Sequence, residues 1–221
     1  MVVARRSDAV NRARIKAAVP DLVESHERDR DRFSTLLSVA RKLLIEDGYA
    51  ELRIRKIAAA AGISIGHLQF LIPTKSKLIE SLWEYSLEFY LQQYKKLLSE
   101  LPPDPVKRLS AVMEFALRDC ENPETRGFFL ELWVAARHEP SARAVKKRTG
   151  RRHHKRLTEF LGDIHPKLTQ DELNSRAFQI AAMVDGLIVN ADLIQSDWPR
   201  EKIFEDMKRT ILAIATAPAR G

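Results

Sequence analysis

Apolar side chains recur at helical spacing along most of the chain. From Phe33 to Leu44 they fall three or four residues apart, and Gly48 ends that run. Residues 53–71 have the pattern of two short helices joined by a tight turn, and residues 74–98 that of a long helix with one broad apolar face. This part of the chain is therefore predicted to be a series of amphipathic helices with short connections.

Polar residues and prolines mark where the later helices begin. Residues 104–105 and 122–123 each place a capping side chain before a proline at the first helical position. Residues 169–172 form a capping box that opens another long helix, and Pro140 and Pro199 mark two more junctions. We predict an all-α fold of about nine helices, without strands, internal repeats or a long linker.

Three residues between positions 53 and 71 have the spacing of a helix-turn-helix. Ala58 is small where the second helix crosses the first, Gly62 can adopt the positive φ of the turn, and Leu68 seals the pair from the second helix. The second helix, from Ser64 to about Leu71, is therefore predicted to enter the major groove of DNA.

This assignment divides the chain into three parts. Residues 1–30 are charged and poor in large apolar groups, which predicts a mobile N-terminal arm. Residues 31–76 form the predicted helix-turn-helix domain, and residues 77–221 a larger helical domain for ligand binding and dimerisation. The helix that begins at Thr74 belongs to both domains, so no flexible linker joins them.

Composition supports a nucleic-acid partner and disfavours several other classes. The net charge of +7 suits a polyanionic ligand, and Cys120 is the only cysteine, which fits a reducing cytoplasm. Apolar runs are much shorter than the roughly 20 residues of a membrane span. The sequence has no glycine-rich phosphate loop, no metal-ligand spacing and no nucleophile beside a base, so we predict neither an enzyme nor a cofactor.

Short motifs in the helix-turn-helix domain, the head of the protein, and one motif in the larger domain, its body, also match a known family. They are Gly48-Tyr49, Ile57-Ala58, Ala61-Gly62-Ile63-Ser64-x-Gly66 and Pro73-Thr74-Lys75 followed by Leu78, with Val184-Asp185-Gly186-Leu187 in the body. In these motifs the chain resembles the tetracycline-repressor (TetR) family of bacterial transcriptional regulators. The resemblance implies a homodimeric repressor whose head binds double-stranded operator DNA and whose body binds a small-molecule effector.

The chain departs from the family pattern within the head. Arg53 stands where the family usually has threonine, and Gln69 where it usually has the tyrosine that meets a phosphate. The resemblance therefore implies the fold more directly than it implies individual DNA contacts. A helical binding or scaffold protein of the same fold, with a degenerate reading head, is the alternative. A mobility-shift assay on the protein's own promoter region decides between the two.

Charges and exposed positions in the head indicate where DNA would bind. Lys75 and Lys77 lie in the first turn of the long helix, where the helix dipole disfavours cations. A phosphate held between Lys75 and the helix N-terminus would satisfy both of them, whereas a solvated lysine pair is the alternative. Ser64 either caps the second short helix or contacts a phosphate. The predicted DNA-contacting residues are Arg53, Arg55, Ser64, Ile65, Gly66, His67, Gln69, Thr74, Lys75 and Lys77.

The sequence of the body indicates its binding sites less clearly than that of the head. Aromatic residues at helical spacing predict an effector pocket, with plain core as the alternative; they are Phe89, Phe115, Cys120, Phe128, Phe129 and Trp133, with His138 as a polar member. Residues 146–156 make one helix strongly basic, which is most simply a solvated face and alternatively attracts an anionic effector or flanking DNA. Small and apolar residues on the last two helices predict a dimer interface of Phe178, Ala181, Ala182, Asp185, Gly186, Val189, Phe204, Met207 and Ile211.

Overall fold

The structure is a computed structural model that describes residues 33–194 and 198–219. The predicted N-terminal arm, residues 1–30, lies outside the described residues. All regular secondary structure in the described ranges is helical, which confirms the predicted all-α fold. None of these helices is long and apolar enough to cross a membrane.

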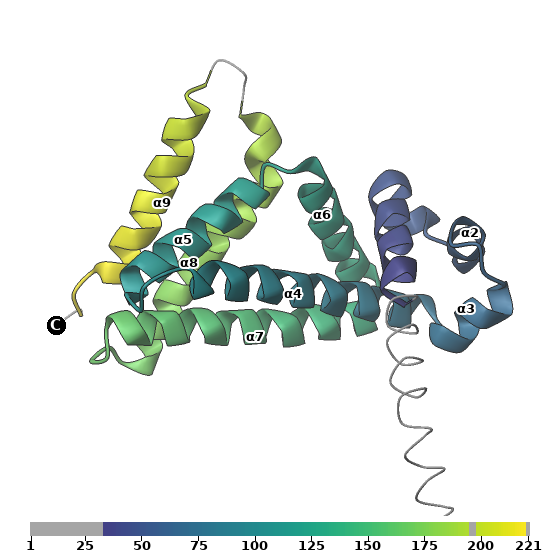
Figure 1. Ribbon diagram of the computed structural model, residues 1–221, viewed down its shortest axis with the longest axis horizontal. Helices are drawn as coiled ribbons and strands as arrows, with labels where there is room; N and C mark the ends of the chain where they lie inside the picture. The colour runs from purple at the N-terminus through teal and green to yellow at the C-terminus, as the bar shows by residue number, and fades with distance from the viewer. Residues whose placement is uncertain (1–32, 195–197, 220–221) are drawn as a thin grey trace, which may run out of the picture.

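The helices form a small head and a larger body (Figure 1). The head contains a helix over residues 33–51, α2 (Ile54–Ala60) and α3 (Ile65–Leu71). The first of these helices continues past Gly48, where the sequence predicted its end, although Gly48 has a φ of +79°. In the body, α4 and α7 lie side by side and run away from the head, and α9 packs on α5 at the far end. The body consists of α4 (Lys75–Ser99), α5 (Pro105–Asp119), α6 (Pro123–His138), α7 (Pro140–Ile164), α8 (Gln170–Asn190), the short 3₁₀ helix η1 (Ala191–Leu193) and α9 (Arg200–Thr216).

Local capping explains where four of the body helices begin. The Asp104 side chain accepts hydrogen bonds from the backbone N–H groups at the start of α5, and Asn122 does the same for α6. Thr169 and Glu172 form the predicted capping box of α8. Thr74 is the N-cap of α4 and accepts a hydrogen bond from the Lys77 N–H, so the helix begins at Lys75, one residue after its predicted start. Each of these caps supplies a partner to backbone N–H groups that lack one inside the helix.

The buried side chains form two clusters, and the first of them is shared between head and body. It joins Ile57 and Leu68 of the head to Leu82 of α4 and to Phe128 and Leu132 of α6. The second cluster lies among α5, α7, α8 and α9. The boundary predicted at residues 76–77 is therefore crossed by a helix and by continuous apolar packing, which ties the position of the head to that of α6.

Candidate nucleic-acid interface

The helix-turn-helix has the packing that the sequence predicts. Ala58 and Leu68 are buried, and Gly62 has a φ of +66°. The Ile63 N–H donates to the carbonyl oxygen of Ala58 at 3.0 Å, which closes the turn between α2 and α3. Left-handed backbone at Gly62 carries no Cβ penalty, so the tight turn forms without strain. The predicted unit is confirmed.

One face of α3 is turned to solvent. Leu68 and Ile72 anchor the helix in the core, whereas Gly66, His67 and Gln69 are exposed. Ile65 is 42% exposed, and Phe70, at 84%, has the most exposed large apolar side chain in the described part of the chain. The structure therefore places four of the predicted contact residues (Ile65, Gly66, His67 and Gln69) on an accessible surface of the second helix.

Phe70 is not among the contact residues predicted from the sequence. At about 100° per residue, Phe70 lies one helical turn after Gly66, and both lie on the side of α3 opposite Leu68. Since Leu68 was already assigned to the core, this spacing was the signal that could have identified Phe70.

Gly66 has no steric role inside the protein. Its φ is not in the left-handed region, and a Cβ built on it meets no atom within 4 Å. A glycine inside a helix costs about 1 kcal/mol relative to alanine. The fold bears this cost without an internal benefit, and the missing side chain leaves the backbone of α3 open to close approach by an external molecule.

Ser64 has the capping role. Its Oγ accepts a hydrogen bond from the His67 N–H at 3.1 Å, at the N-terminus of α3. The contact of Ser64 with a phosphate stays a prediction, as do those of Arg55 and Thr74, both of which are exposed.

Lys75 has partners within the chain. Its Nζ donates to the carbonyl oxygen of Tyr49 at 2.7 Å and lies 3.9 Å from the centroid of the Tyr49 ring. Burial lowers the pKa of Lys75, and the Glu139 carboxylate partly opposes this shift. Internal hydrogen bonding thus explains part of why a cation is tolerated at this helix N-terminus.

Two of the other predicted cations also have nearby carboxylates. Lys77 lies 2.8 Å from Glu80, and Arg53 lies 3.2 Å from Glu51. All four side chains are at least partly exposed, so these ion pairs are weak and can exchange for phosphate contacts. The phosphate contacts of Lys75, Lys77 and Arg53 therefore stay predictions.

A salt titration of one variant tests the Lys75 contact. An ammonium group has three N–H donors, one of which goes to Tyr49, and the others can reach a phosphate oxygen. Lys75→Gln is expected to reduce the slope of log affinity against log salt by about 0.9 for each phosphate that the protein no longer neutralises. Lys96→Gln, in the last turn of the same helix, is the matched control and should leave the slope unchanged. Equal slopes for the two variants would show that Lys75 has only its internal role.

Tyr49 links the head to α6 and α7. Its backbone N–H donates to Glu131 Oε2 at 2.6 Å, and its hydroxyl donates to Glu139 Oε1 at 2.6 Å. Burial, together with the Glu139 carboxylate, raises the pKa of Tyr49 well above its ordinary value. Tyr49 therefore stays a neutral hydrogen-bond donor, held between the Lys75 ammonium and two carboxylates of the body. The sequence gives no signal of this connection, because its members are 26 to 90 residues apart.

Most of the predicted pocket residues do not line an open pocket in the described structure. Phe128 and Cys120 are buried in the two core clusters, and Phe89 and His138 are exposed. Phe115 and Phe129 belong to an aromatic cluster with Tyr90 and Tyr94, in which Tyr90 stacks on Phe129 at 5.9 Å between ring centroids. For Phe115, Cys120, Phe128 and Phe129 the alternative of plain core describes the structure better than a pocket lining does.

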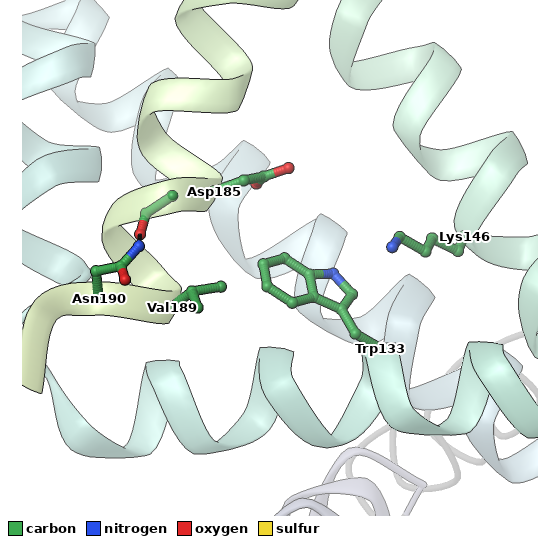
Figure 2. A pocket seen from close by; sticks show the side chains of 6 residues that line it. Trp133, Lys146, Asp185, Val189 and Asn190 are labelled. Atoms are coloured by element: carbon green, nitrogen blue, oxygen red, sulfur yellow. Dashed lines mark hydrogen bonds between the residues drawn. The ribbon is translucent and has the colours of Figure 1, made fainter.

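Trp133 is the predicted pocket residue that lines a cavity. The cavity is an open groove of about 360 Å³ between α6, α7 and α8. Figure 2 shows the indole of Trp133 and the side chains of Lys146 and Asp185 extending from these three helices toward one space. The Lys146 Nζ lies 5.2 Å from the indole centroid. Gly186, Val189 and Asn190 complete the lining.

The predicted dimer surface divides into an exposed and a buried part. Phe178, Ala182, Asp185 and Val189 recur every three or four residues on α8 and are exposed, Phe178 by 68%. Ala181, Gly186 and Met207 are partly buried. Phe204 and Ile211 differ from the prediction, because they are only 4% and 0% exposed and pack in the core of the same chain. The bulky apolar face of α9 is used to cover α5, so it is not an accessible stripe.

The basic run on α7 is partly neutralised by α4. Arg148 lies 3.0 Å from Glu80 and 2.9 Å from Glu84, and Arg152 lies 3.9 Å from Glu84. These pairs are partly exposed and hold the two long helices side by side. They support the interpretation of this run as a solvated face.

Comparison with known proteins identifies both parts of the chain. Residues 36–82 match the family model described as bacterial regulatory proteins, tetR family. Residues 105–216 match the model described as BetI-type transcriptional repressor, C-terminal. Among curated relatives, the transcriptional regulator CymR of Pseudomonas putida is 29% identical over 195 residues, covering 86% of this chain and 91% of CymR. The regulator BetI of Proteus mirabilis is 26% identical over 166 residues, covering 73% of this chain and 80% of BetI.

Solved structures share the fold. A regulator from Pseudomonas aeruginosa PAO1, described as putative, superposes with a TM-score of 0.72 at 20% identity, covering 87% of this chain and 95% of that one. A regulator from Saccharomonospora viridis, solved in complex with choline, superposes with a TM-score of 0.67 at 17% identity, covering 83% and 96%. With the confirmed helix-turn-helix and the matches of both domains, the chain belongs to the tetR family of bacterial regulatory proteins and is a DNA-binding transcriptional regulator.

Proposed function

We propose that this regulator is a homodimeric repressor that a small-molecule effector releases from its operator. The observation that carries the proposal is the packing of α6 between an open groove and the DNA-binding head. Trp133 extends from α6 toward the groove, and Glu131 accepts the hydrogen bond of the Tyr49 N–H. Two residues apart on a helix, these side chains point to opposite sides of α6.

This geometry supplies a route from ligand to DNA. An effector that contacts Trp133 and shifts α6 also shifts Glu131, and with it Tyr49 and the Lys75 end of α4. Because the first apolar cluster joins α6 to the head, a shift of α6 also moves the head. In a two-fold dimer, the two recognition helices must lie roughly 34–36 Å apart, or a multiple of that distance, to reach successive major grooves. A ligand that favours another spacing lowers operator affinity.

The chemistry of the groove favours an effector with a positive charge. A flat indole and a carboxylate are the groups that recognise a quaternary ammonium, and Trp133 and Asp185 present both. In the described structure the Lys146 ammonium takes the place beside the indole. The S. viridis neighbour of the same fold was solved with choline. Choline is therefore the first probe to use.

Ligand binding by charge variants tests this assignment. Choline is expected to bind the wild-type protein, and Trp133→Leu to weaken it about tenfold, since a desolvated cation–π contact contributes about 1–2 kcal/mol. Lys146→Met is expected to strengthen choline binding, because it removes the competing cation. Titration calorimetry measures both changes, with Trp198→Leu as the matched control. If Lys146→Met instead weakens binding of a ligand found by screening, the groove takes an anionic effector.

The exposed face of α8 supports the homodimer. A second copy packed on Phe178, Ala182 and Val189 would cover an apolar stripe and lie beside the groove. Sedimentation at micromolar concentration tests this surface, and a monomer there would count against the dimer.

A transcription assay tests the repressor role as a whole. Footprinting on the DNA upstream of the protein's own gene should show a protected site whose affinity falls steeply with salt. Transcription in vitro from that promoter should fall when the protein is added and recover when the effector is added. Binding with no preference over random DNA would contradict the proposal.

A further inference from the structure

Phe70 stands out because its large apolar side chain points to solvent from the exposed face of α3. It is 84% exposed, although a single exposed apolar residue elsewhere on a protein needs no explanation. What needs an explanation is the position of Phe70 on the exposed face of α3. Leu68 and Ile72, both fully buried, determine the rotation of α3 about its axis, and this rotation points Phe70 directly away from the core.

The neighbours of Phe70 on α3 define what the helix presents outward. Gly66 lies one turn earlier on the same line, and a side chain there would meet nothing within the protein. His67 and Gln69 flank this line and are exposed. The outward surface thus consists of a bare stretch of backbone, two polar side chains and the ring of Phe70, with Ile65 exposed at the first position of the helix. Gly66 allows DNA to approach the backbone closely at one end of this line, and Phe70 offers an apolar contact at the other.

The chemistry of phenylalanine limits what it can recognise on DNA. Its ring neither donates nor accepts a conventional hydrogen bond, so it cannot read the polar edges of bases or bind a phosphate oxygen through one. The major groove presents one apolar group, the C5 methyl of thymine. His67 and Gln69 are the side chains here that can form hydrogen bonds to base edges or phosphates.

We propose that Phe70 reads a thymine methyl in each operator half-site and is a specificity-determining residue of this regulator. The proposal rests on the DNA binding described above and assigns a base to one named side chain. Contact between the ring and the methyl removes apolar surface of both from water. Any other base at that position lacks the methyl group, so the ring has no apolar partner there.

The test removes the methyl group from the DNA and the ring from the protein, separately and together. An operator is first selected from random duplexes by the wild-type protein. Each thymine is then replaced in turn by uracil, which keeps Watson–Crick pairing and lacks the methyl group. Affinities are measured by fluorescence anisotropy at one fixed salt concentration. The proteins are the wild type, Phe70→Ala and, as the matched neighbour, Gln69→Ala.

One thymine in each half-site is expected to be sensitive. Its replacement by uracil should weaken wild-type binding by about fourfold, the value of one buried methyl group. Phe70→Ala should bind the thymine operator more weakly and should no longer distinguish it from the uracil operator. Gln69→Ala should keep the distinction. Thermal unfolding of Phe70→Ala should match that of the wild type, since its ring is exposed.

Other results would overturn the proposal in recognisable ways. If Phe70→Ala remains as sensitive to uracil as the wild type, another residue reads the methyl group. If it weakens binding to operator and random DNA equally, the ring contacts the sugar–phosphate backbone. If it changes the oligomeric state, the ring belongs to a protein interface. Failure of the wild type to select any sequence would overturn the repressor proposal itself, and this result is distinct from the other three.

Discussion

Replacing Gly66 with leucine is expected to weaken operator binding by about 100-fold while leaving the fold at least as stable as the wild type. The two effects separate because the glycine has no packing partner within the chain. A side chain in each of two half-sites would hold α3 away from the groove. A loss at each site comparable to a mismatched base pair, roughly 1–3 kcal/mol, accounts for the reduction.

Stability should change in the opposite direction. Gly66 lies in a helix with right-handed backbone, so a residue with higher helix propensity should gain roughly 0.5–1 kcal/mol. Urea denaturation measures this gain, and a mobility-shift titration on the selected operator measures the affinity. A variant that is both more stable and unable to bind would identify the position as a contact surface.

Gly150 is a matched control for this substitution. It is also exposed, lies in the long helix α7, and a Cβ built on it meets nothing within 4 Å. Gly150→Leu should therefore stabilise the fold by a similar amount and leave operator affinity unchanged. If Gly66→Leu binds the operator as well as Gly150→Leu does, the backbone of α3 does not approach DNA closely.

Replacing Phe128 with alanine is expected to destabilise the protein by about 3–5 kcal/mol and to unfold head and body together. Phe128 is 1% exposed and belongs to the cluster that joins α6 to the head. The guanidinium group of Arg41, from the helix over residues 33–51, lies 5.1 Å from the centroid of its ring. Loss of the ring leaves a cavity at the junction of the two domains.

Two measurements test this expectation. Urea denaturation at a fixed protomer concentration gives the change in the free energy of unfolding. Hydrogen exchange in the same variant should show loss of protection in residues 33–51 together with α6. Phe70→Ala, the same change at an exposed position, should lie within about 0.5 kcal/mol of the wild type. A head that keeps its protection while the body opens would show that the two domains fold independently.

Short-range features of this protein were predictable because their causes lie within a few residues. A cap and its N–H partner are two or three residues apart, as at Asp104, Asn122 and Thr169. The turn at Gly62 depends on residues between Ala58 and Leu68, and so the helix-turn-helix followed from the sequence.

Which side of a helix faces the core could not be predicted in the body. Phe128 and Trp133 are five residues apart on α6, yet one is buried at the junction with the head and the other lines the groove. Phe204 and Ile211 have the spacing of an exposed stripe, but α5 covers them. Apolar periodicity identifies the face that a helix buries and does not identify the partner that buries it.

The sequence by itself determined the all-α class, the starts of several helices and the recognition helix, since capping, propensity and turn geometry act over a few residues. Only the tertiary structure decided the rest. It placed Lys75 on Tyr49 and connected Tyr49 to Glu131 and Glu139. These contacts join residues far apart in the chain, and their geometry depends on how whole helices pack against one another.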